Sequence, residues 1–276
     1  MAAGAIFALG PALLFCPADR PDRFRKALDR ADAVILDLED AVAPADRPAA
    51  RDALRHSGLD PTRVIVRINS ADSADFGEDL AAVRACGYRT VMLPKAASHL
   101  DARRIAAFDE SLGVIALCES AAGIAAVREI AAESNVAALM WGAEDLIASL
   151  GGMASRFVDG RYRPVAEYAR AAVLIAAGAA GKAAIDTVHL DIADTDGLAA
   201  EAADAVASGF QATACIHPSQ VEIIRAAYRP STGEVADAQA MLAAAREHPG
   251  VFRWGDRMVD APVLRHAEAI LRRARP

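Results

Sequence analysis

Charged or ionisable side chains stand at the end of one short apolar run after another along this chain. Arg67, Lys95 and Glu119 end three successive runs, and further polar groups, Asp145, Asp191 and His217, stand at the ends of later ones. Cationic side chains at such places bind anions or pair with carboxylates, and carboxylates bind hard cations such as Mg²⁺. The residue types therefore predict an active site assembled from several strand ends.

Two of these carboxylates are candidates for a metal site. Glu119 lies in ALCES and Asp145 in WGAED. Two carboxylates from neighbouring strand ends can hold Mg²⁺ and still leave coordination positions for water and substrate. The alternative is that both side chains cap the helices that follow. Glu144 competes with Asp145 within the same motif.

The cationic and imidazole groups each have two interpretations. Arg67 cannot remain unpaired beside a buried strand, because an isolated buried charge is prohibitively costly. It therefore either binds an anionic substrate or forms an ion pair with Glu39 or Asp40 at the rim of the sheet. Lys95 fits a Schiff-base lysine and equally fits an ion pair. His217, directly before Pro-Ser, indicates a capping group more than a catalyst.

The elements that must position these residues are short apolar runs that alternate with helix-length segments. Nearly continuous hydrophobic runs are typical of parallel strands buried on both faces, and the alternation indicates βαβ units. No G-x-G-x-x-G follows the first run and no P-loop motif occurs. We therefore predict the α/β class and a (β/α)₈ TIM barrel, with chemistry at the carboxyl ends of its strands. The predicted strands are residues 12–18, 33–40, 64–69, 90–95, 114–120, 137–145, 186–191 and 213–220.

The chain of 276 residues suits a single barrel, expected over residues 12–230. Residues 1–11 are predicted to form a flexible N-terminal tail. No Lys or Arg precedes Arg20, so the tail lacks the positive region of a signal peptide. The strand–helix alternation stops near Pro230. We expect residues 231–276 to form a C-terminal helical extension that acts as a lid and contacts a neighbouring subunit.

Composition excludes several classes of protein. The net charge is −7 and no block of Lys or Arg occurs, which argues against a nucleic-acid partner. No apolar segment reaches the ~18 residues of a membrane span. Cys16, Cys86, Cys118 and Cys215 show no CxxC spacing, which favours reduced cysteines in a cytoplasmic protein.

Eight segments, in order along the chain, resemble the citrate lyase β-subunit-like group of the HpcH/HpaI aldolase superfamily. They extend from about residue 13 to residue 264, and the group includes malyl-CoA and citramalyl-CoA lyases. The segments are LLFCPADRPDRFRKAL, VILDLEDAVAP, VIVRIN, TVMLPKA, ALCESAAGI, WGAEDLIASLGG, CIHPSQ and MVDAPVL.

The resemblance implies a role for each matching position. Arg67 would contact the substrate carbonyl or enolate, and Glu119 and Asp145 would hold Mg²⁺, with Mn²⁺ as an alternative. Glu119 would also contact the substrate.

Three residues of the first segment, Phe15, Arg20 and Lys26, would hold coenzyme A. Asp260 would complete the active site of a neighbouring subunit in a homotrimer, or in a hexamer built from trimers. The alternative is that Asp260 is only a turn residue before Pro262.

The activity implied by the resemblance is a Mg²⁺-dependent carbon–carbon lyase reaction. It would cleave a β-hydroxyacyl-CoA of the citramalyl-CoA or malyl-CoA type into acetyl-CoA and a 2-oxo acid by a retro-Claisen mechanism. Three alternatives stay open. They are a citrate lyase β subunit that acts on citryl-acyl carrier protein in a complex, a CoA thioesterase or malate-synthase-like enzyme, and a metal-dependent 2-oxo acid aldolase.

Overall fold

The computed structural model describes residues 9–248 and 250–274, which divide into two compact units. The first unit ends at Ile224 and the second begins at Arg225. This division falls inside helix α10 (Pro218–Tyr228), a few residues before the boundary expected at residue 230. Most of the tail expected over residues 1–11 lies outside the described residues.

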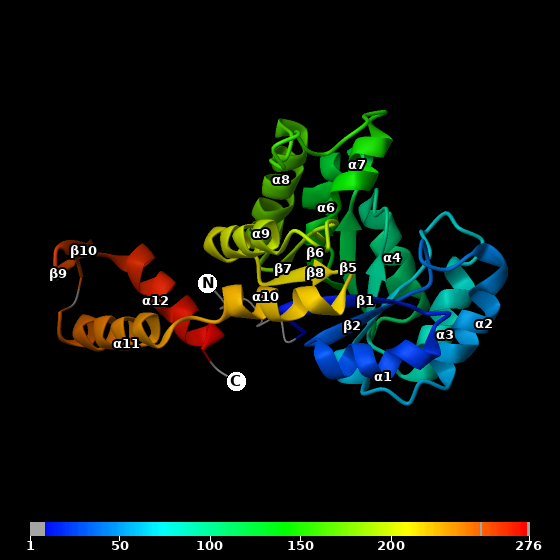
Figure 1. The fold of residues 1–276 in the computed structure, drawn as a ribbon, viewed down its shortest axis with the longest axis horizontal. Helices are drawn as coiled ribbons and strands as arrows, with labels where there is room; N and C mark the ends of the chain where they lie inside the picture. Colours follow the sequence, from blue (N-terminus) through cyan, green and yellow to red (C-terminus); the bar gives the residue numbers. More distant parts are fainter. Residues whose placement is uncertain (1–8, 249, 275–276) are drawn as a thin grey trace. The chain divides into compact units, whose positions relative to one another are not determined.

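Eight parallel strands of the first unit close into a barrel in which β8 pairs with β1 (Figure 1). The predicted TIM barrel is therefore confirmed. Most strand residues are buried and apolar, as expected for strands that are covered on both faces. The strands are β1 (Ala12–Pro17), β2 (Ala33–Asp37), β3 (Val64–Arg67), β4 (Thr90–Leu93), β5 (Gly113–Cys118), β6 (Val136–Trp141), β7 (Ala183–Asp186) and β8 (Ala212–Cys215).

Helices follow the strands and begin and end at residues suited to those places. Ser98 and Asp101 form a reciprocal capping box at the start of α4. Gly181 and Gly209 end α8 and α9 in the left-handed conformation that glycine adopts without strain. The helices of the barrel are α1 (Pro21–Arg30), α2 (Arg47–Arg55), α3 (Phe76–Cys86), α4 (His99–Phe108), α5 (Ala121–Ala125), α6 (Val127–Ala132), α7 (Ala143–Ser149), α8 (Pro164–Ala180) and α9 (Thr195–Ser208), with short 3₁₀ turns η1 (Pro44–Asp46) and η2 (Pro61–Arg63).

The prediction for the seventh strand is wrong. We expected residues 186–191, but β7 is Ala183–Asp186, which pairs with β6 through residues 183–185. Alanine has low strand propensity, so the run Ala183-Ala184 carries little local signal, and pairing with neighbouring strands decides the assignment. Asp191 therefore does not end a strand. It lies exposed in the following loop, where its Oδ1 accepts a hydrogen bond from the Ala193 N–H at 2.9 Å.

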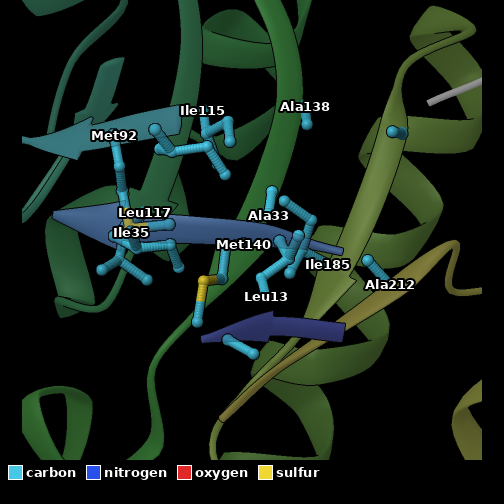
Figure 2. Close-up of a cluster of buried hydrophobic side chains, with 13 residues drawn as sticks. Leu13, Ala33, Ile35, Met92, Ile115, Leu117, Ala138, Met140, Ile185 and Ala212 are labelled. Carbon is cyan, nitrogen blue, oxygen red and sulfur yellow. The ribbon is translucent and has the colours of Figure 1, made fainter. Parts of the chain in front are cut away.

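The inside of the barrel is filled by side chains from all eight strands (Figure 2). Small alanines face larger Leu, Ile and Met side chains, so the interior is a packed core and not a channel. Each large apolar side chain buried here contributes about 1.5–3 kcal/mol of hydrophobic stabilisation. The core consists of Leu13, Ala33, Ile35, Ile65, Met92, Ile115, Leu117, Ala138, Met140, Ala183, Ile185, Ala212 and Ala214.

On four strands, the inward-facing positions continue from this core to the mouth of the barrel. Because alternate residues face the same side, the residue two positions after an inward core residue also faces inward. On β1, β2, β3 and β5 that position holds a chemically active or aromatic side chain. These four residues are Phe15, Asp37, Arg67 and Glu119.

The second unit is a small assembly of two helices and a hairpin. Helix α11 (Thr232–Glu247) and helix α12 (Ala261–Arg273) flank an antiparallel pair, β9 (Phe252–Trp254) and β10 (Arg257–Val259). Its apolar core consists of Ala238, Met241, Val259, Ala267 and Ile270. The sequence predicted helices here but not the hairpin.

Two further expectations concern the whole chain. The four cysteines are free thiols, and Cys16, Cys118 and Cys215 are buried, as expected of core cysteines. Within the described residues, no helix is both long and apolar enough to span a membrane.

Candidate active site

Five charged side chains meet where β2 to β6 end. The Lys95 ammonium lies 2.5 Å from Glu39 Oε1 and 3.8 Å from Asp145 Oδ1. The Lys95 main-chain N–H donates to Glu119 Oε1 at 3.0 Å, and Arg67 Nη1 lies 3.1 Å from Glu39 Oε2. Four of the six strand-end residues singled out in the sequence therefore form one cluster, with Glu39 as an additional member.

Arg67 is held by an aspartate that the sequence interpretation overlooked. Its Nε and Nη2 donate to the two oxygens of Asp37 at 2.7 and 2.6 Å. The expected partners, Glu39 and Asp40, are additional, at 3.1 and 3.8 Å from Nη1. Asp37 and Arg67 occupy the same register position on the neighbouring strands β2 and β3. Strand register, which sequence spacing does not specify, brings the two side chains together.

The surroundings of Arg67 keep it charged and oriented. Its side chain is 12% exposed, and burial alone would lower its pKa. The hydrogen bonds and negative charge of Asp37 outweigh burial, so the pKa of Arg67 is raised. The guanidinium also lies over the ring of Phe15, 5.0 Å from its centroid, a cation–π contact. Arg67 is therefore a fixed positive charge at the barrel mouth.

Lys95 forms the ion pair that was one of its two expected states. Burial would lower its pKa, but the hydrogen bond to Glu39 raises it above the usual value. Its backbone is left-handed, with φ 51°. This conformation directs the main-chain N–H toward Glu119 while the ammonium contacts Glu39.

Glu119 is the most unusual carboxylate of the cluster. It is 4% exposed, and among the described residues no lysine or arginine side chain lies within ion-pair distance of it. Burial raises the pKa of Glu119 to about 8, and the nearby charge of Asp145 adds to the rise. Removing a carboxylate from water without a cation is costly. This group is therefore suited to bind a cation that the chain itself does not supply.

Asp145 and Glu144 are separated by their contacts. Both lie in the first turn of α7, but Glu144 Oε1 accepts a hydrogen bond from Ser155 Oγ at 2.5 Å. Asp145 faces Lys95 and is 42% exposed. Since Glu144 is engaged by Ser155, Asp145 is the freer of the two to act with Glu119.

Gly142 is a second residue that the sequence interpretation overlooked. A Cβ at this position would lie 2.7 Å from Glu119 Oε2 and 2.9 Å from Glu119 Cβ. Real Cβ atoms do not approach so closely, so only glycine leaves room for the glutamate. A glycine directly after strand β6 was the available signal.

These groups line a cavity of about 150 Å³. Its polar wall includes Arg67, Glu119 and Asp145, and its apolar wall consists of Phe15, Leu117, Met140, Val188 and Leu190, among others. The described residues contain no group of three or more His, Cys, Asp or Glu side chains placed to hold a metal unaided. Oxygen ligands from two carboxylates, completed by water and substrate, nevertheless fit Mg²⁺, which keeps several non-protein ligands.

The remaining predicted residues lie elsewhere. Arg20, at the start of α1, forms an exposed ion pair with Asp22 at 3.1 Å, and Lys26 is exposed on the same helix. His217 is exposed, and its Nδ1 accepts a hydrogen bond from the Ser219 main-chain N–H at 3.2 Å at the start of α10, as expected of a capping group. Asp260 belongs to the second unit, where its Oδ1 caps helix α12 by accepting from the Val263 N–H.

A (β/α)₈ barrel whose strand ends converge on acidic and basic side chains has the architecture of an enzyme. Residues 12–218 match the HpcH/HpaI aldolase/citrate lyase family, and the chain belongs to that family. This membership makes it a carbon–carbon lyase, the class of citrate lyase β subunits and malyl-CoA lyases.

Three known proteins illustrate the range of similarity. A citrate lyase subunit beta-like protein of Mycobacterium tuberculosis is 55% identical, over 97% of this chain and 96% of its own length. An L-malyl-CoA/beta-methylmalyl-CoA lyase of Rhodobacter capsulatus is 32% identical, over 95% of this chain and 93% of its own. The crystal structure of CitE from M. tuberculosis with magnesium, acetoacetate and coenzyme A superposes with a TM-score of 0.90, at 54% identity, over 97% of this chain and 98% of that one.

Proposed function

We propose that this protein is a Mg²⁺-dependent lyase that cleaves a β-hydroxyacyl-CoA of the citramalyl-CoA or malyl-CoA type into acetyl-CoA and a 2-oxo acid. The observation that carries the proposal is the pair Glu119 and Asp145, which face one cavity together with the fixed positive charge of Arg67. The complex of M. tuberculosis CitE with magnesium, acetoacetate and coenzyme A supports it.

Glu119 and Asp145 would hold the metal. Bound there, Mg²⁺ supplies Lewis-acid polarisation of the hydroxyl and carboxylate oxygens of the substrate. The two side chains come from neighbouring strand ends, so they would approach the ion from one side and leave the other side to the substrate. Buried Glu119 also excludes bulk water from that side of the cavity.

Arg67 would stabilise the negative charge that develops on the thioester oxygen when the carbon–carbon bond breaks. A positive group helps most when it is already oriented before the reaction. Asp37 and the ring of Phe15 orient Arg67 in this way. In this step the β-hydroxyl group gives up its proton and becomes the ketone of the 2-oxo acid, while the electron pair of the broken carbon–carbon bond passes to the enolate of acetyl-CoA. The enolate must then take up a proton.

Asp260 would deliver that proton to the enolate carbon, from a neighbouring subunit of a homotrimer. Its carboxyl group lies at the N-terminus of α12 in the second unit. Coenzyme A would be held by Phe15 on β1, Arg20 at the start of α1 and Lys26 within α1. The two cationic side chains would face its phosphates.

The apolar wall of the cavity favours a small apolar substituent on the 2-oxo acid. Leu117, Met140 and Val188 suit the methyl group that distinguishes citramalyl-CoA from malyl-CoA. A second carboxylate, as in citryl substrates, would need another cation, and Arg156 on this wall is already paired with Glu201. One methyl group is worth only ~1–3 kcal/mol of selectivity, so we expect both thioesters to react and citramalyl-CoA to react faster.

The direct test is to separate the products formed from citramalyl-CoA, malyl-CoA and citryl-CoA with and without Mg²⁺. Acetyl-CoA and a 2-oxo acid in equal amounts are expected, with Arg67→Ala inactive and the exposed-site control Arg89→Ala fully active. Release of free coenzyme A would instead identify a thioesterase or a malate-synthase-like enzyme. Cleavage of free 4-hydroxy-2-oxo acids without CoA would identify a 2-oxo acid aldolase. Turnover of citryl-acyl carrier protein alone would identify a citrate lyase subunit.

The proposed role of Asp260 has its own test. Glu119→Ala and Asp260→Ala are each expected to be inactive, and subunits of the two variants are mixed by co-expression. If Asp260 acts in a neighbouring site, random mixing of equal amounts restores roughly a quarter of the sites. If it acts within its own subunit, the mixture stays inactive.

A further inference from the structure

We propose that Lys95 is a positioning residue that limits the metal site to two carboxylates, by holding Glu39 and Asp40 away from the ion. The inference rests on the proposed function, in which Glu119 and Asp145 hold Mg²⁺. It assigns a role to a lysine that the proposed reaction does not otherwise use.

The position of Lys95 between two groups of acids is the first observation. Its ammonium lies 2.5 Å from Glu39, 3.7 Å from Asp40 and 3.8 Å from Asp145. Glu39 and Asp40 follow β2, whereas Asp145 follows β6. Lys95 is thus the cation that separates the acids of the β2 side from those of the metal side.

The backbone of Lys95 is the second observation. It is the one non-glycine residue with positive φ in the described chain. A lysine is strained in this conformation, whereas a glycine would adopt it freely. The conformation lets one residue do two things, since its N–H donates to Glu119 while its ammonium contacts Glu39. The strain therefore indicates that the side chain itself is needed at this place.

The charges decide what loss of the ammonium would do. Glu39 is buried, and after loss of Lys95 it would share Arg67 with Asp37 and Asp40. The surplus negative charge beside the metal site would strengthen the attraction for a divalent cation. Glu39 or Asp40 could then occupy positions around the ion that the substrate needs. A purely structural lysine predicts the opposite, because a disordered site binds metal more weakly.

The experiment measures Mg²⁺ affinity by calorimetry on the full-length protein. Lys95→Met keeps the length of the side chain and removes the charge. We expect it to bind Mg²⁺ roughly threefold to tenfold more tightly. We also expect the fold-decrease in kcat to exceed the fold-change in KM. Adding Glu39→Gln to this variant is expected to return the affinity to that of the parent protein. Lys95→Arg is expected to keep the parent affinity.

A spectroscopic readout checks the same point. With Mn²⁺ as the probe, water relaxation reports the exchangeable waters on the ion, and we expect fewer of them in Lys95→Met. Lys95→Gly removes both the charge and the backbone strain, and it should bind Mg²⁺ more tightly too. Unchanged or weaker affinity in Lys95→Met and Lys95→Gly, or no reversal by Glu39→Gln, overturns the inference.

Glu119→Gln, measured in parallel, separates this inference from the proposed function. If it abolishes Mg²⁺ binding while the Lys95 variants bind no more tightly than the parent, only the role of Lys95 is wrong. If Glu119→Gln binds Mg²⁺ as the parent does, the proposed metal site itself is wrong.

Discussion

The two sides of the barrel mouth differ in whether their carboxylates are paired with basic side chains. On the side of β2 to β4, acids and bases are matched: Asp37 pairs with Arg67, and Glu39 pairs with Lys95. On the side of β5 and β6, Glu119 and Asp145 are two neighbouring carboxyl groups, and burial, together with the charge of Asp145, raises the pKa of Glu119. On the matched side each buried carboxylate, Asp37 and Glu39, has a basic partner, whereas buried Glu119 lacks one and calls for an added cation.

This difference indicates which residues form the scaffold and which are reserved for chemistry. A matched buried pair is costly to break, because removing one partner strands the other. A buried carboxylate without a cation is costly to keep and tends to mark a functional site. Substitutions on the two sides should therefore change stability in opposite directions, and the following predictions test that.

The largest effect is expected from Glu119→Gln. Loss of one metal ligand should lower kcat/KM at least about 1000-fold, measured with citramalyl-CoA and Mg²⁺. The same change removes a buried carboxylate that is at least partly ionised at pH 8.5. The Tm of the metal-free protein at this pH should therefore rise. Glu129→Gln, at an exposed position on α6, is the control and should change neither. A lower Tm in Glu119→Gln would contradict the comparison.

On the matched side, Asp37→Asn should destabilise the protein. Arg67 would remain buried without its main partner, which costs about 3 kcal/mol in the free energy of unfolding, measured by urea denaturation. Asp52→Asn is the matched control, because it breaks an exposed pair with Arg55 and should cost at most about 0.5 kcal/mol. Equal costs for the two variants would show that the Asp37–Arg67 pair is not structural.

The raised pKa of Glu119 predicts how metal affinity depends on pH. Mg²⁺ binds the ionised form, and the pKa of about 8 means that this form becomes scarce below pH 8. Affinity should therefore fall about tenfold per pH unit between pH 8 and pH 6. Calorimetry in two buffers of different ionisation enthalpy should show nearly one proton released per Mg²⁺ at pH 7. A pH-independent affinity would exclude a protonated Glu119.

The same pKa shift has a consequence for the metal-free fold. The folded pKa lies above the usual value of 4.5, so the folded state takes up a proton that the unfolded state does not. The stability linked to that proton is fully present below about pH 4.5 and is lost as the pH rises through about 8. Comparing the pH profile of the Tm with that of Glu119→Gln isolates this contribution.

The smallest effect is expected at Gly142. In Gly142→Ala the new Cβ would displace Glu119, and we expect about a tenfold loss of Mg²⁺ affinity and 1–3 kcal/mol of destabilisation. Gly178→Ala, inside α8 with open space around the new Cβ, is the control and should be slightly stabilising. Unchanged Mg²⁺ affinity in Gly142→Ala would mean that the glutamate can shift without cost.

Much of the site could be predicted because the barrel geometry is regular. Glu119 and Arg67 each stand two residues after an inward core residue, and parallel strands end on the same face. The partner of Arg67 was not predicted, because sequence spacing does not specify the register between β2 and β3. The hairpin of the second unit was also not predicted, because its strands are only three residues long.

The sequence by itself determined the barrel, the family resemblance and the strand ends that carry chemistry, because hydrophobic periodicity and local motifs are properties of neighbouring residues. The tertiary structure decided which charges neutralise one another. It placed Asp37 against Arg67 and Glu39 against Lys95, moved the seventh strand to Ala183–Asp186, and left Glu119 buried beside Asp145. Those outcomes depend on distances and burial between strands far apart in sequence, which set the strength of every electrostatic interaction.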